Sequence, residues 1–336
     1  MDFRSDNVWG ASPEILDALA AANSGSAGAY GDDDWTTALE ARFAEVFERE
    51  VGVFVVGTGS AANGLALSVM APPWGVVYCH KDAHVEVDEC GGPEFFTGGA
   101  KLATQDGKDG KLQADALAPA IVGKGFVHAP QPAGISITQA SEAGTVYRPA
   151  EVRALSELAR ANGLKLHMDG ARFANALVSL ETSPAEITWK AGVDLLSFGG
   201  TKNGCMAGEA LLVFDPDLAE TLGFRRKRVG HLFSKMRFFS VQLLAYLEGD
   251  LWLKNARRAN AAAMALAGEL EALGATLAHP TEANEVFAQL PDDLVKRLEA
   301  AGFLFYPWPA AGAGGHRFVA SFLSDAEAVR AAFRRL

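Results

Sequence analysis

The chain has 336 residues and a formal net charge of −11, and 49% of its residues are hydrophobic, 21% charged and 9% aromatic. This composition is typical of globular proteins, and the length allows one large domain and a smaller one. The acidic balance argues against nucleic acid and anionic membranes as partners, so an anionic ligand would need a local basic cluster.

The cysteines and the N-terminus predict a cytoplasmic protein. Cys79, Cys90 and Cys205 form no CxxC pair, which fits a reducing compartment better than a disulfide framework. Residues 1–10 contain no apolar stretch of the kind that a secretory signal requires. No apolar run approaches the roughly 18 residues of a membrane span.

The N-terminal part is expected to hold an extended segment followed by two helices. Residues 1–10 are too polar for a core strand, and the run SDN at 5–7 either supplies ligand groups or belongs to a frayed end. Helices are expected at 13–22 and at about 35–47, with Tyr30 in the small-residue loop between them.

A glycine-rich loop, Gly57–Asn63 (GTGSAAN), follows an expected strand at Val51–Val56 and leads into an amphipathic helix. The free N–H groups and the positive dipole end of such a helix suit a phosphate, although a tight turn would also need the glycines. The loop also matches G-x-G-x-x-A, a dinucleotide fingerprint, with Asp82 near the end of the next strand. This alternative would make the protein an NAD-dependent dehydrogenase.

Histidines and acids follow the next expected strand, Val76–Cys79. His80, His84 and Asp88 have a spacing that would put metal ligands on one helix face, but His80 falls at the strand end, so no metal site is predicted. His84 and Asp88 remain as a pair one turn apart, in which a carboxylate orients an imidazole for general base work. The alternative is a capped surface helix.

The middle of the chain is predicted as short elements around one long loop. The Pro- and Ser/Thr-rich stretch 129–147, with His128 at its mouth, is expected to be functional, because long loops in compact domains usually are. The other elements expected here are a strand at 95–97, a loop at 101–110, a helix at 112–122, a strand at 125–128 and a helix at 149–162.

Two apolar runs end in loops that carry an acid and an amine. Leu164–Met168 leads into DGAR, and Val193–Phe198 leads into GGTK. In a βαβ unit the two strands are parallel, so Asp169 and Lys202 are expected at one edge of the sheet, where open α/β sheets bind ligands. Pyridoxal phosphate needs a lysine for a Schiff base and an acid for its ring nitrogen. The alternative is an ordinary salt bridge.

The pattern of expected elements changes near residue 248, where an alanine-rich helix is followed by alternating strands and helices. We therefore divide the chain into a large domain at 1–247 and a small α+β domain at 248–336. The basic run at 225–228 either forms a solvated face or helps to neutralise an anion across a subunit boundary. Arg317 begins an apolar strand, where an arginine needs a carboxylate partner or ligand. The remaining elements expected are strands at 210–214, 275–278, 285–289 and 317–322 and helices ending near 247, 273, 301 and 335.

These motifs together resemble the low-specificity L-threonine aldolases of the beta-eliminating lyase/threonine aldolase family. The motifs follow the family order through nearly the whole chain: SDN at 5–7, AYGDD at 29–33, GTGSAAN at 57–63, AHVEVDECGG at 83–92, HMDGAR at 167–172 and SFGGTKNG at 197–204. The resemblance implies a fold-type I (aspartate aminotransferase-like) α/β large domain with a mainly parallel sheet, a small C-terminal domain and pyridoxal 5'-phosphate as cofactor. The implied reaction is cleavage of L-threonine or L-allo-threonine to glycine and an aldehyde; the nearest alternative is another fold-type I lyase or aminotransferase.

The resemblance also implies a role for individual residues. Lys202 matches the Schiff-base lysine, Asp169 the partner of the pyridine nitrogen, and His84 the histidine that stacks on the ring and helps to deprotonate the substrate hydroxyl. The residues that match the phosphate loop are Thr58, Gly59 and Ser60. The residues that match ligands of the substrate carboxylate are Ser5, Arg172 and Arg317, with Arg172 also near the cofactor.

Other implications concern the assembly and the departures from the family pattern. Tyr30 corresponds to a residue that reaches into a neighbour's site, which implies a homodimer with shared sites and often a tetramer. Many members have Tyr-Glu where this chain has Asp88-Glu89, so the chain matches a subgroup with the His84/Asp88 pair. The family's loop histidine is absent near Thr138, and His128 is the candidate to replace it as a substrate ligand.

Overall fold

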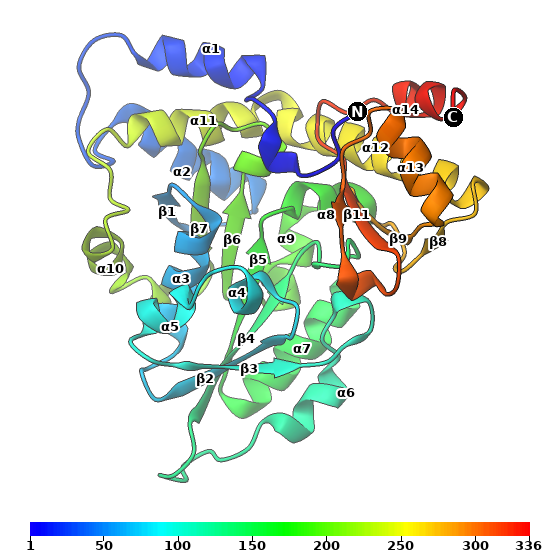
Figure 1. Cartoon of the computed structure of the whole chain (residues 1–336). Helices are drawn as coiled ribbons and strands as arrows, with labels where there is room; N and C mark the ends of the chain where they lie inside the picture. Colours follow the sequence, from blue (N-terminus) through cyan, green and yellow to red (C-terminus); the bar gives the residue numbers. More distant parts are fainter.

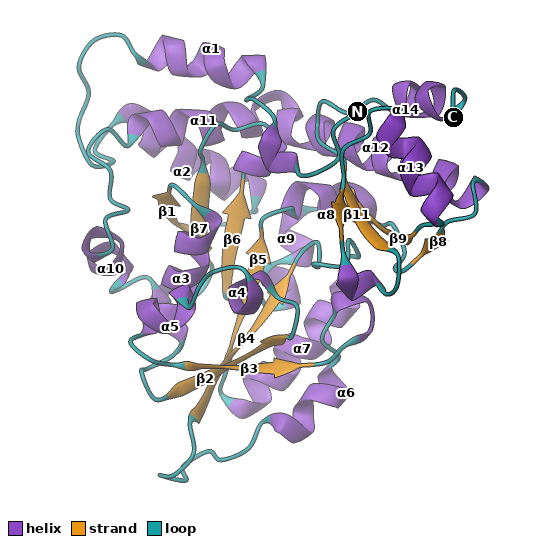
Figure 2. Cartoon of the chain, viewed as in Figure 1, coloured by secondary structure: helices purple, strands orange, loops and turns teal.

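The computed structural model describes residues 1–336, and a seven-stranded sheet forms its centre (Figure 1; Figure 2). Across the sheet the strands are β1 (Gly52–Val56), β7 (Glu209–Val213), β6 (Leu195–Gly199), β5 (Lys165–Gly170), β4 (Gln131–Thr138), β2 (Gly75–His80) and β3 (Lys101–Gln105). All strands point the same way except β7, which is antiparallel to both neighbours. The carboxyl ends of β1, β5 and β6 and the amino end of β7 therefore lie at one edge.

Helices cover both faces of this sheet, so its central strands are apolar on both sides. On β7, Leu211 packs into the core beneath α3, whereas its neighbour Leu212 points into the larger core on the opposite face. The helices associated with the two faces are α2 (Asp34–Val46), α7 (Pro149–Asn162), α8 (Phe173–Leu180) and α11 (Arg237–Leu247) on one, and α3 (Gly59–Met70), α5 (Gly92–Thr97) and α10 (Leu222–Arg228) on the other.

A second, antiparallel sheet forms the C-terminal domain at the upper right of Figure 1. Its strands, in spatial order, are β10 (Tyr306–Pro307), β11 (Gly315–Val319), β9 (Glu285–Gln289) and β8 (Thr276–Leu277), and its helices are α12 (Leu251–Ala272), α13 (Asp292–Ala300) and α14 (Ala326–Phe333). Helix α12 joins the two domains, because Trp252 belongs to the main core and Leu266 to the second core. The N-terminal segment also reaches this domain, where Phe3 is buried in the second core.

The fold class expected from the sequence is confirmed: α/β with a mainly parallel sheet and a small C-terminal antiparallel sheet. Helices α1 (Pro13–Ala22) and α7 have the bounds that the sequence predicts. The domain division at 247/248 stays a prediction, since α12 begins at Leu251 and contributes to both cores.

Several predictions for the middle of the chain are wrong. Residues 95–97 belong to α5, and 101–105 form the edge strand β3 instead of a loop. Residues 125–128 form turns, and the predicted long loop 129–147 contains the central strand β4. The helix expected at 112–122 is reduced to α6 (Ala114–Leu117) and one 3-10 turn.

The dehydrogenase alternative is also wrong. A dinucleotide fingerprint requires a strand that pairs with the next strand in the same βαβ unit. Here β1 lies at an edge of the sheet and pairs only with β7, and four strands separate it from β2. Asp82 is exposed beyond the end of β2. No helix is long and apolar enough to cross a membrane.

Candidate active site

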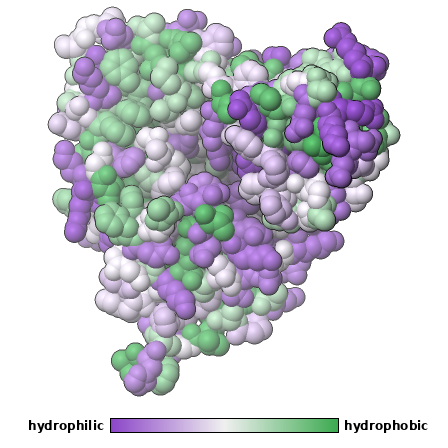
Figure 3. Space-filling model, in the orientation of Figure 1, coloured by the Kyte–Doolittle hydropathy of each residue, from purple (hydrophilic) through white to green (hydrophobic).

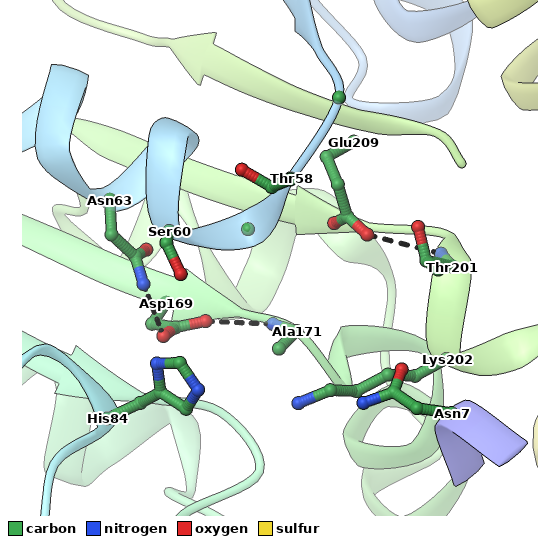
Figure 4. A pocket seen from close by; sticks show the side chains of 12 residues that line it. Asn7, Thr58, Ser60, Asn63, His84, Asp169, Ala171, Thr201, Lys202 and Glu209 are labelled. Atoms are coloured by element: carbon green, nitrogen blue, oxygen red, sulfur yellow. Dashed lines mark hydrogen bonds between the residues drawn. The ribbon is translucent and has the colours of Figure 1, made fainter. Parts of the chain in front are cut away.

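A cavity of about 230 Å³ lies where the strand ends converge (Figure 4). Its walls come from the loop after β1, the end of β5, the 3-10 turn η5 (Thr201–Asn203) after β6, and the start of β7. The lining residues are Asn7, Gly57, Thr58, Gly59, Ser60, Asn63, His84, Asp169, Ala171, Thr201, Lys202 and Glu209. Figure 3 shows this face of the molecule hollowed between the C-terminal domain and the large domain.

The first turn of α3 forms one wall and is suited to an anion. Thr58 is the N-cap, and its Oγ1 accepts a hydrogen bond from the backbone N–H of Ala61 at 3.2 Å. The N–H groups of Gly59 and Ser60 have no intrahelical acceptor and donate to no other group. A Cβ atom at Gly59 would meet nothing within 4 Å, so space remains in front of these donors. This geometry fits a phosphate.

Asp169 and Lys202 face the cavity from neighbouring strand ends, as the sequence predicts (Figure 4). The Asp169 side chain is buried, and its two oxygens accept hydrogen bonds from Asn63 Nδ2 at 2.8 Å and from the backbone N–H of Ala171 at 3.0 Å. Lys202 makes no ion pair, so its amine is available to a ligand.

His84 lies beside Asp169, but its carboxylate partner is Glu89 and the predicted pairing with Asp88 is wrong. His84 Nδ1 is 2.8 Å from Glu89 Oε1, and the same oxygen accepts a hydrogen bond from Asn63 Nδ2. Helix α4 (His84–Val87) is a single turn, so the chain leaves the helix at Asp88 and turns Glu89 back into the interior. Asp88 is exposed and lines a neighbouring cavity.

The hydrogen bond to Glu89 determines the tautomer of His84 and raises its pKa. The hydrogen bond that His84 donates to Glu89 raises the pKa of His84, with a further contribution from Asp169, against the opposing effect of burial. A carboxylate accepts, so Nδ1 carries a proton and the other ring nitrogen, Nε2, is left as an acceptor. This orientation suits a general base.

Arg172 is buried next to the cavity in an ion-pair cluster. Its Nε and Nη2 donate to the two oxygens of Asp6 at 2.8 and 3.1 Å, and Nη1 lies 3.2 Å from Glu285 Oε2. Burial opposes ionisation of Asp6, but Arg172 and Lys202 hold the pKa of Asp6 below its usual value. The predicted role of Arg172 as a substrate ligand stays a prediction, because these carboxylates already engage every guanidinium nitrogen.

Arg317 keeps unused donors. Its guanidinium stacks on the Trp308 ring at 4.5 Å, its buried Nε has no acceptor, and one Nη2 contact to the carbonyl of Arg4 is long, at 3.5 Å. Arg317 lies on β11 and forms no ion pair with Glu285 or any other acid. An arginine with a free buried donor is suited to bind a carboxylate from a ligand.

Three other predicted residues lie outside the cavity lining. Ser5 caps the 3-10 turn η1 (Asp6–Val8) by accepting from the N–H of Asn7. Tyr30 is about half exposed beneath Lys227, and its role in a neighbouring site stays a prediction. His128 is exposed in the turn before β4, at the opposite end of that strand from the cavity, so the structure contradicts its predicted role.

Sequence reasoning missed several residues that the fold brings to the cavity. Asn63 is a polar residue inside an otherwise apolar helix, and this pattern indicates a buried side chain with polar partners. Asp6 and Asn7 belong to the motif SDN, in which the family resemblance assigns a role to Ser5 alone. No local sequence pattern identifies Glu89 or Glu209 as a site residue, because their burial depends on contacts between distant segments.

The residues present fit pyridoxal phosphate: an unpaired lysine, a buried carboxylate facing it and an anion site on a helix N-terminus share one cavity. Together with the sheet order, they define the fold-type I class of pyridoxal phosphate-dependent enzymes. An aspartate aminotransferase from Thermus thermophilus, 18% identical, has the same fold with a TM-score of 0.69, covering 97% of this chain and 88% of its own.

Comparisons with known proteins agree with this class. Residues 2–293 match the family model described as beta-eliminating lyase. A low specificity L-threonine aldolase from Pseudomonas aeruginosa is 47% identical over 98% of this chain and 94% of its own length. The solved threonine aldolase of Leishmania major is 27% identical, with a TM-score of 0.93 over 99% of this chain and 98% of its own. The chain belongs to the beta-eliminating lyase family, in the group of the low-specificity L-threonine aldolases.

Proposed function

We propose that the protein cleaves L-threonine, L-allo-threonine and related β-hydroxy-α-amino acids to glycine and an aldehyde, with pyridoxal 5'-phosphate as its cofactor. The observation that carries this proposal is the convergence of Lys202, Asp169 and His84 on one cavity with an anion site at its end. The activity named for the Pseudomonas and Leishmania relatives supports it.

Three groups of this chain would hold the cofactor. Lys202 is the amine for its aldehyde, Asp169 is the acid for its ring nitrogen, and the first turn of α3 receives its phosphate. When bound, pyridoxal phosphate supplies an aldehyde that takes up an amino group and a ring that accepts the electron pair released at the α-carbon.

Substrate orientation depends on the carboxylate ligands. Arg317 is the principal one, because its Nε is buried without an acceptor. Ser5 and Arg172 are retained as further proposed ligands. Fixing the carboxylate presents the bond between the α- and β-carbons for cleavage, which is an effect of orientation.

His84 acts as the base that starts the cleavage. Its Nε2 takes the proton of the substrate β-hydroxyl, while Glu89 holds the proton on Nδ1. The hydroxyl oxygen becomes the carbonyl oxygen of the aldehyde as the bond between the α- and β-carbons breaks. A proton delivered to the α-carbon then completes glycine.

We also propose that the protein is a homo-oligomer in which neighbours complete each other's sites. Tyr30 is about half exposed on the surface of one chain, and Phe95 and Phe224, both largely exposed, line one apolar groove near α10. Such surfaces are typical of association sites.

Product analysis tests the reaction. Purified protein incubated with L-threonine is expected to release glycine and acetaldehyde in equal amounts. Ammonia with a keto acid would indicate β-elimination, and a keto acid formed together with an aminated cofactor would indicate transamination; either result would overturn the proposal.

The cofactor assignment has a separate optical test. The purified protein is expected to be yellow and to lose its visible absorbance on treatment with borohydride, which reduces a lysine-bound aldehyde. The Lys202→Ala variant should lack this absorbance. A variant that keeps the wild-type spectrum would show that another residue holds the cofactor.

A further inference from the structure

Glu209 is a buried acid in the cavity for which the proposed reaction has no use. It is the first residue of β7, is 6% exposed, and lines the same cavity as Lys202 and Asp169. Strand β7 is antiparallel to its neighbours, so its first residue lies at the edge where the parallel strands end. This placement explains why a residue so far along the chain enters the site.

Glu209 also lies next to the anion site. Its partner across the strand pair is Val56, the last residue of β1, which is followed directly by the loop Gly57–Ser60. Figure 4 shows its carboxyl group between Thr58 and Thr201, and Gly57 and Gly59 line the same cavity. A phosphate on the first turn of α3 would therefore have Glu209 as a neighbour.

The contacts of Glu209 leave one carboxyl oxygen uncommitted. Oε1 accepts a hydrogen bond from the backbone N–H of Thr201 at 3.2 Å, and Glu209 has no ion pair. Lys202 is the only lysine or arginine among the lining residues, and the proposed function commits its amine to the cofactor aldehyde. An ionised carboxylate here would repel a phosphate dianion, whereas the neutral acid can donate a hydrogen bond to it.

We propose that Glu209 binds the phosphate of the cofactor as a neutral carboxylic acid that donates a hydrogen bond, so that cofactor binding takes up one proton. This inference rests on the proposed function, because it requires the cofactor phosphate on α3. It assigns to Glu209 a role in cofactor binding and none in the cleavage itself.

The surroundings of Glu209 support its neutral form. Burial raises the pKa of Glu209 to about 7, with a contribution from Asp169, against the opposing effects of Thr201 and Lys202. Three further titratable groups near Glu209 stay neutral near pH 8, because burial raises the pKa of the Cys205 thiol and the Tyr246 hydroxyl and lowers the pKa of His231, whose Nδ1 accepts from the N–H of Gly57. Helix α3 contributes no ionisable side chain.

The test measures binding of pyridoxine 5'-phosphate to full-length protein freed of its cofactor, between pH 7 and pH 9. This probe carries the phosphate but has no aldehyde to react with Lys202, and its phosphate is dianionic above about pH 7. The dissociation constant of the wild type should rise about tenfold per pH unit. Glu209→Gln should change by less than about threefold over the same range, because its amide donates at every pH.

Calorimetry in two buffers of different ionisation enthalpy supplies a second readout that needs no variant. At pH 8 the wild type should take up close to one proton for each probe bound. The Glu209→Gln variant should take up none. Pyridoxine, which lacks the phosphate, should show no proton uptake with either protein.

The outcomes separate this inference from the proposed function. Binding of pyridoxal phosphate through Lys202 together with no proton uptake, or with parallel pH profiles for the two proteins, would overturn the Glu209 inference alone. Loss of binding by a folded Glu209→Gln variant at every pH would also overturn it, because a carboxylate would then be required. Failure of both phosphorylated compounds to bind would overturn the inference and the proposed function together.

Discussion

At the scale of single residues, the side-chain amide of Asn63 connects the acid and the base of the site. Its Nδ2 donates to Glu89 at 2.8 Å and to Asp169 at 2.8 Å, and Glu89 in turn accepts from His84. Two carboxylates and an imidazole are thereby held in one orientation without a cation between them. His84 accordingly depends on Glu89 for both its tautomer and its basicity.

Replacing Glu89 should therefore change the pH dependence of the reaction. His84 must be neutral to act as a base, and the Glu89 carboxylate raises the pKa of His84. In Glu89→Gln the imidazolium loses this stabilisation, so the acidic limb of the kcat/KM profile should move to lower pH. Turnover above that limb should fall, by up to the roughly hundredfold that general base catalysis contributes. Steady-state kinetics between pH 5 and pH 9 provide the measurement.

Asp88→Asn is the matched control for this prediction, because it removes an adjacent carboxylate that does not contact His84. Its acidic limb should coincide with that of the wild type. If Asp88→Asn moves the limb and Glu89→Gln does not, Asp88 is the partner of His84 after all, and the orientation of α4 described above is incorrect.

Substrate affinity should depend on Arg317. The Arg317→Ala variant should raise KM for L-threonine by about tenfold to a hundredfold, since a hydrogen bond between charged groups contributes roughly 1.5–3 kcal/mol. Cofactor absorbance should be unchanged, because no cavity-lining residue is altered. Arg317→Lys keeps the charge and should recover only part of the affinity, because a lysine lacks the planar pair of donors. An unchanged KM in Arg317→Ala would remove this residue from the site.

The sequence predicts the residues whose role follows from position alone. Lys202 and Asp169 lie directly at strand ends, and Thr58, Gly59 and Ser60 begin a helix, so local order along the chain is enough to bring them together. Spacing could not distinguish Asp88 from Glu89. The choice depends on where α4 ends, after only four residues, and on the burial of Glu89 against Asn63 on another helix.

At the scale of secondary structure, α3 illustrates how one element serves both stability and binding. Its inner residues Leu65 and Leu67 are fully buried under the sheet, which fixes the direction of the helix and so the position of its first turn. The Thr58 hydroxyl closes that turn. The anion site is therefore a consequence of core packing.

Thr58→Ala should weaken both properties. Loss of the N-cap hydrogen bond is expected to lower the free energy of unfolding of the cofactor-free protein by about 1 kcal/mol. Cofactor affinity should also fall, because the first turn that presents the Gly59 and Ser60 donors is less well ordered. Thr58→Ser keeps the capping oxygen and should match the wild type in both measurements. Equal urea midpoints for Thr58→Ala and Thr58→Ser would show that the cap contributes nothing.

Strand β4 shows why the long loop predicted at 129–147 is wrong. Its sequence, QPAGISIT, contains residues typical of loops, yet residues 134–137 are buried between two parallel neighbours. Gly134 packs closely against α3, because a Cβ atom there would lie 2.3 Å from the terminal methyl of Met70 and would force that side chain to move. Loop-like composition is here a consequence of close packing between a strand and a helix. The helices α1 and α7, by contrast, carry their signals in their own sequence.

At the scale of the whole molecule, the N-terminal segment links the two domains across the site. Phe3 is buried in the C-terminal core, and its backbone bonds to Leu304 and Val319 at 2.8 Å each. Three residues later, Asp6 pairs with Arg172 of the large domain and accepts from Asn284 of the small one. Asn7 then lines the cavity. The relative position of the domains, and so of Arg317, depends on this segment.

The ion-pair cluster at this junction has more acids than it can neutralise. Arg172 is bound bidentately by Asp6, which leaves Glu285 with a single ion-pair contact at 3.2 Å through Oε2, an oxygen that accepts no hydrogen bond. Burial raises the pKa of Glu285 to about 7, with contributions from Glu142 and Asp6, although Arg172 acts in the opposite direction. The pKa of this acid is 4.5 in the unfolded chain and about 7 in the folded protein. Its contribution to stability is therefore lost as the pH rises from 4.5 towards 7.

Glu285→Gln should therefore stabilise the protein in alkaline solution. Below about pH 4.5 both side chains are neutral and the free energies of unfolding should agree, and by pH 8 the variant should be more stable by on the order of 3 kcal/mol, since each pKa unit corresponds to about 1.4 kcal/mol. Asp6→Asn is the contrasting variant: the pKa of Asp6 is lowered, so its stabilisation is present near neutral pH and is lost only in acid. Urea unfolding at pH 4.5, 6 and 8 distinguishes the two effects. If both variants destabilise the protein equally at pH 8, Glu285 is a full partner of Arg172, and the second carboxylate is required to hold the domains together.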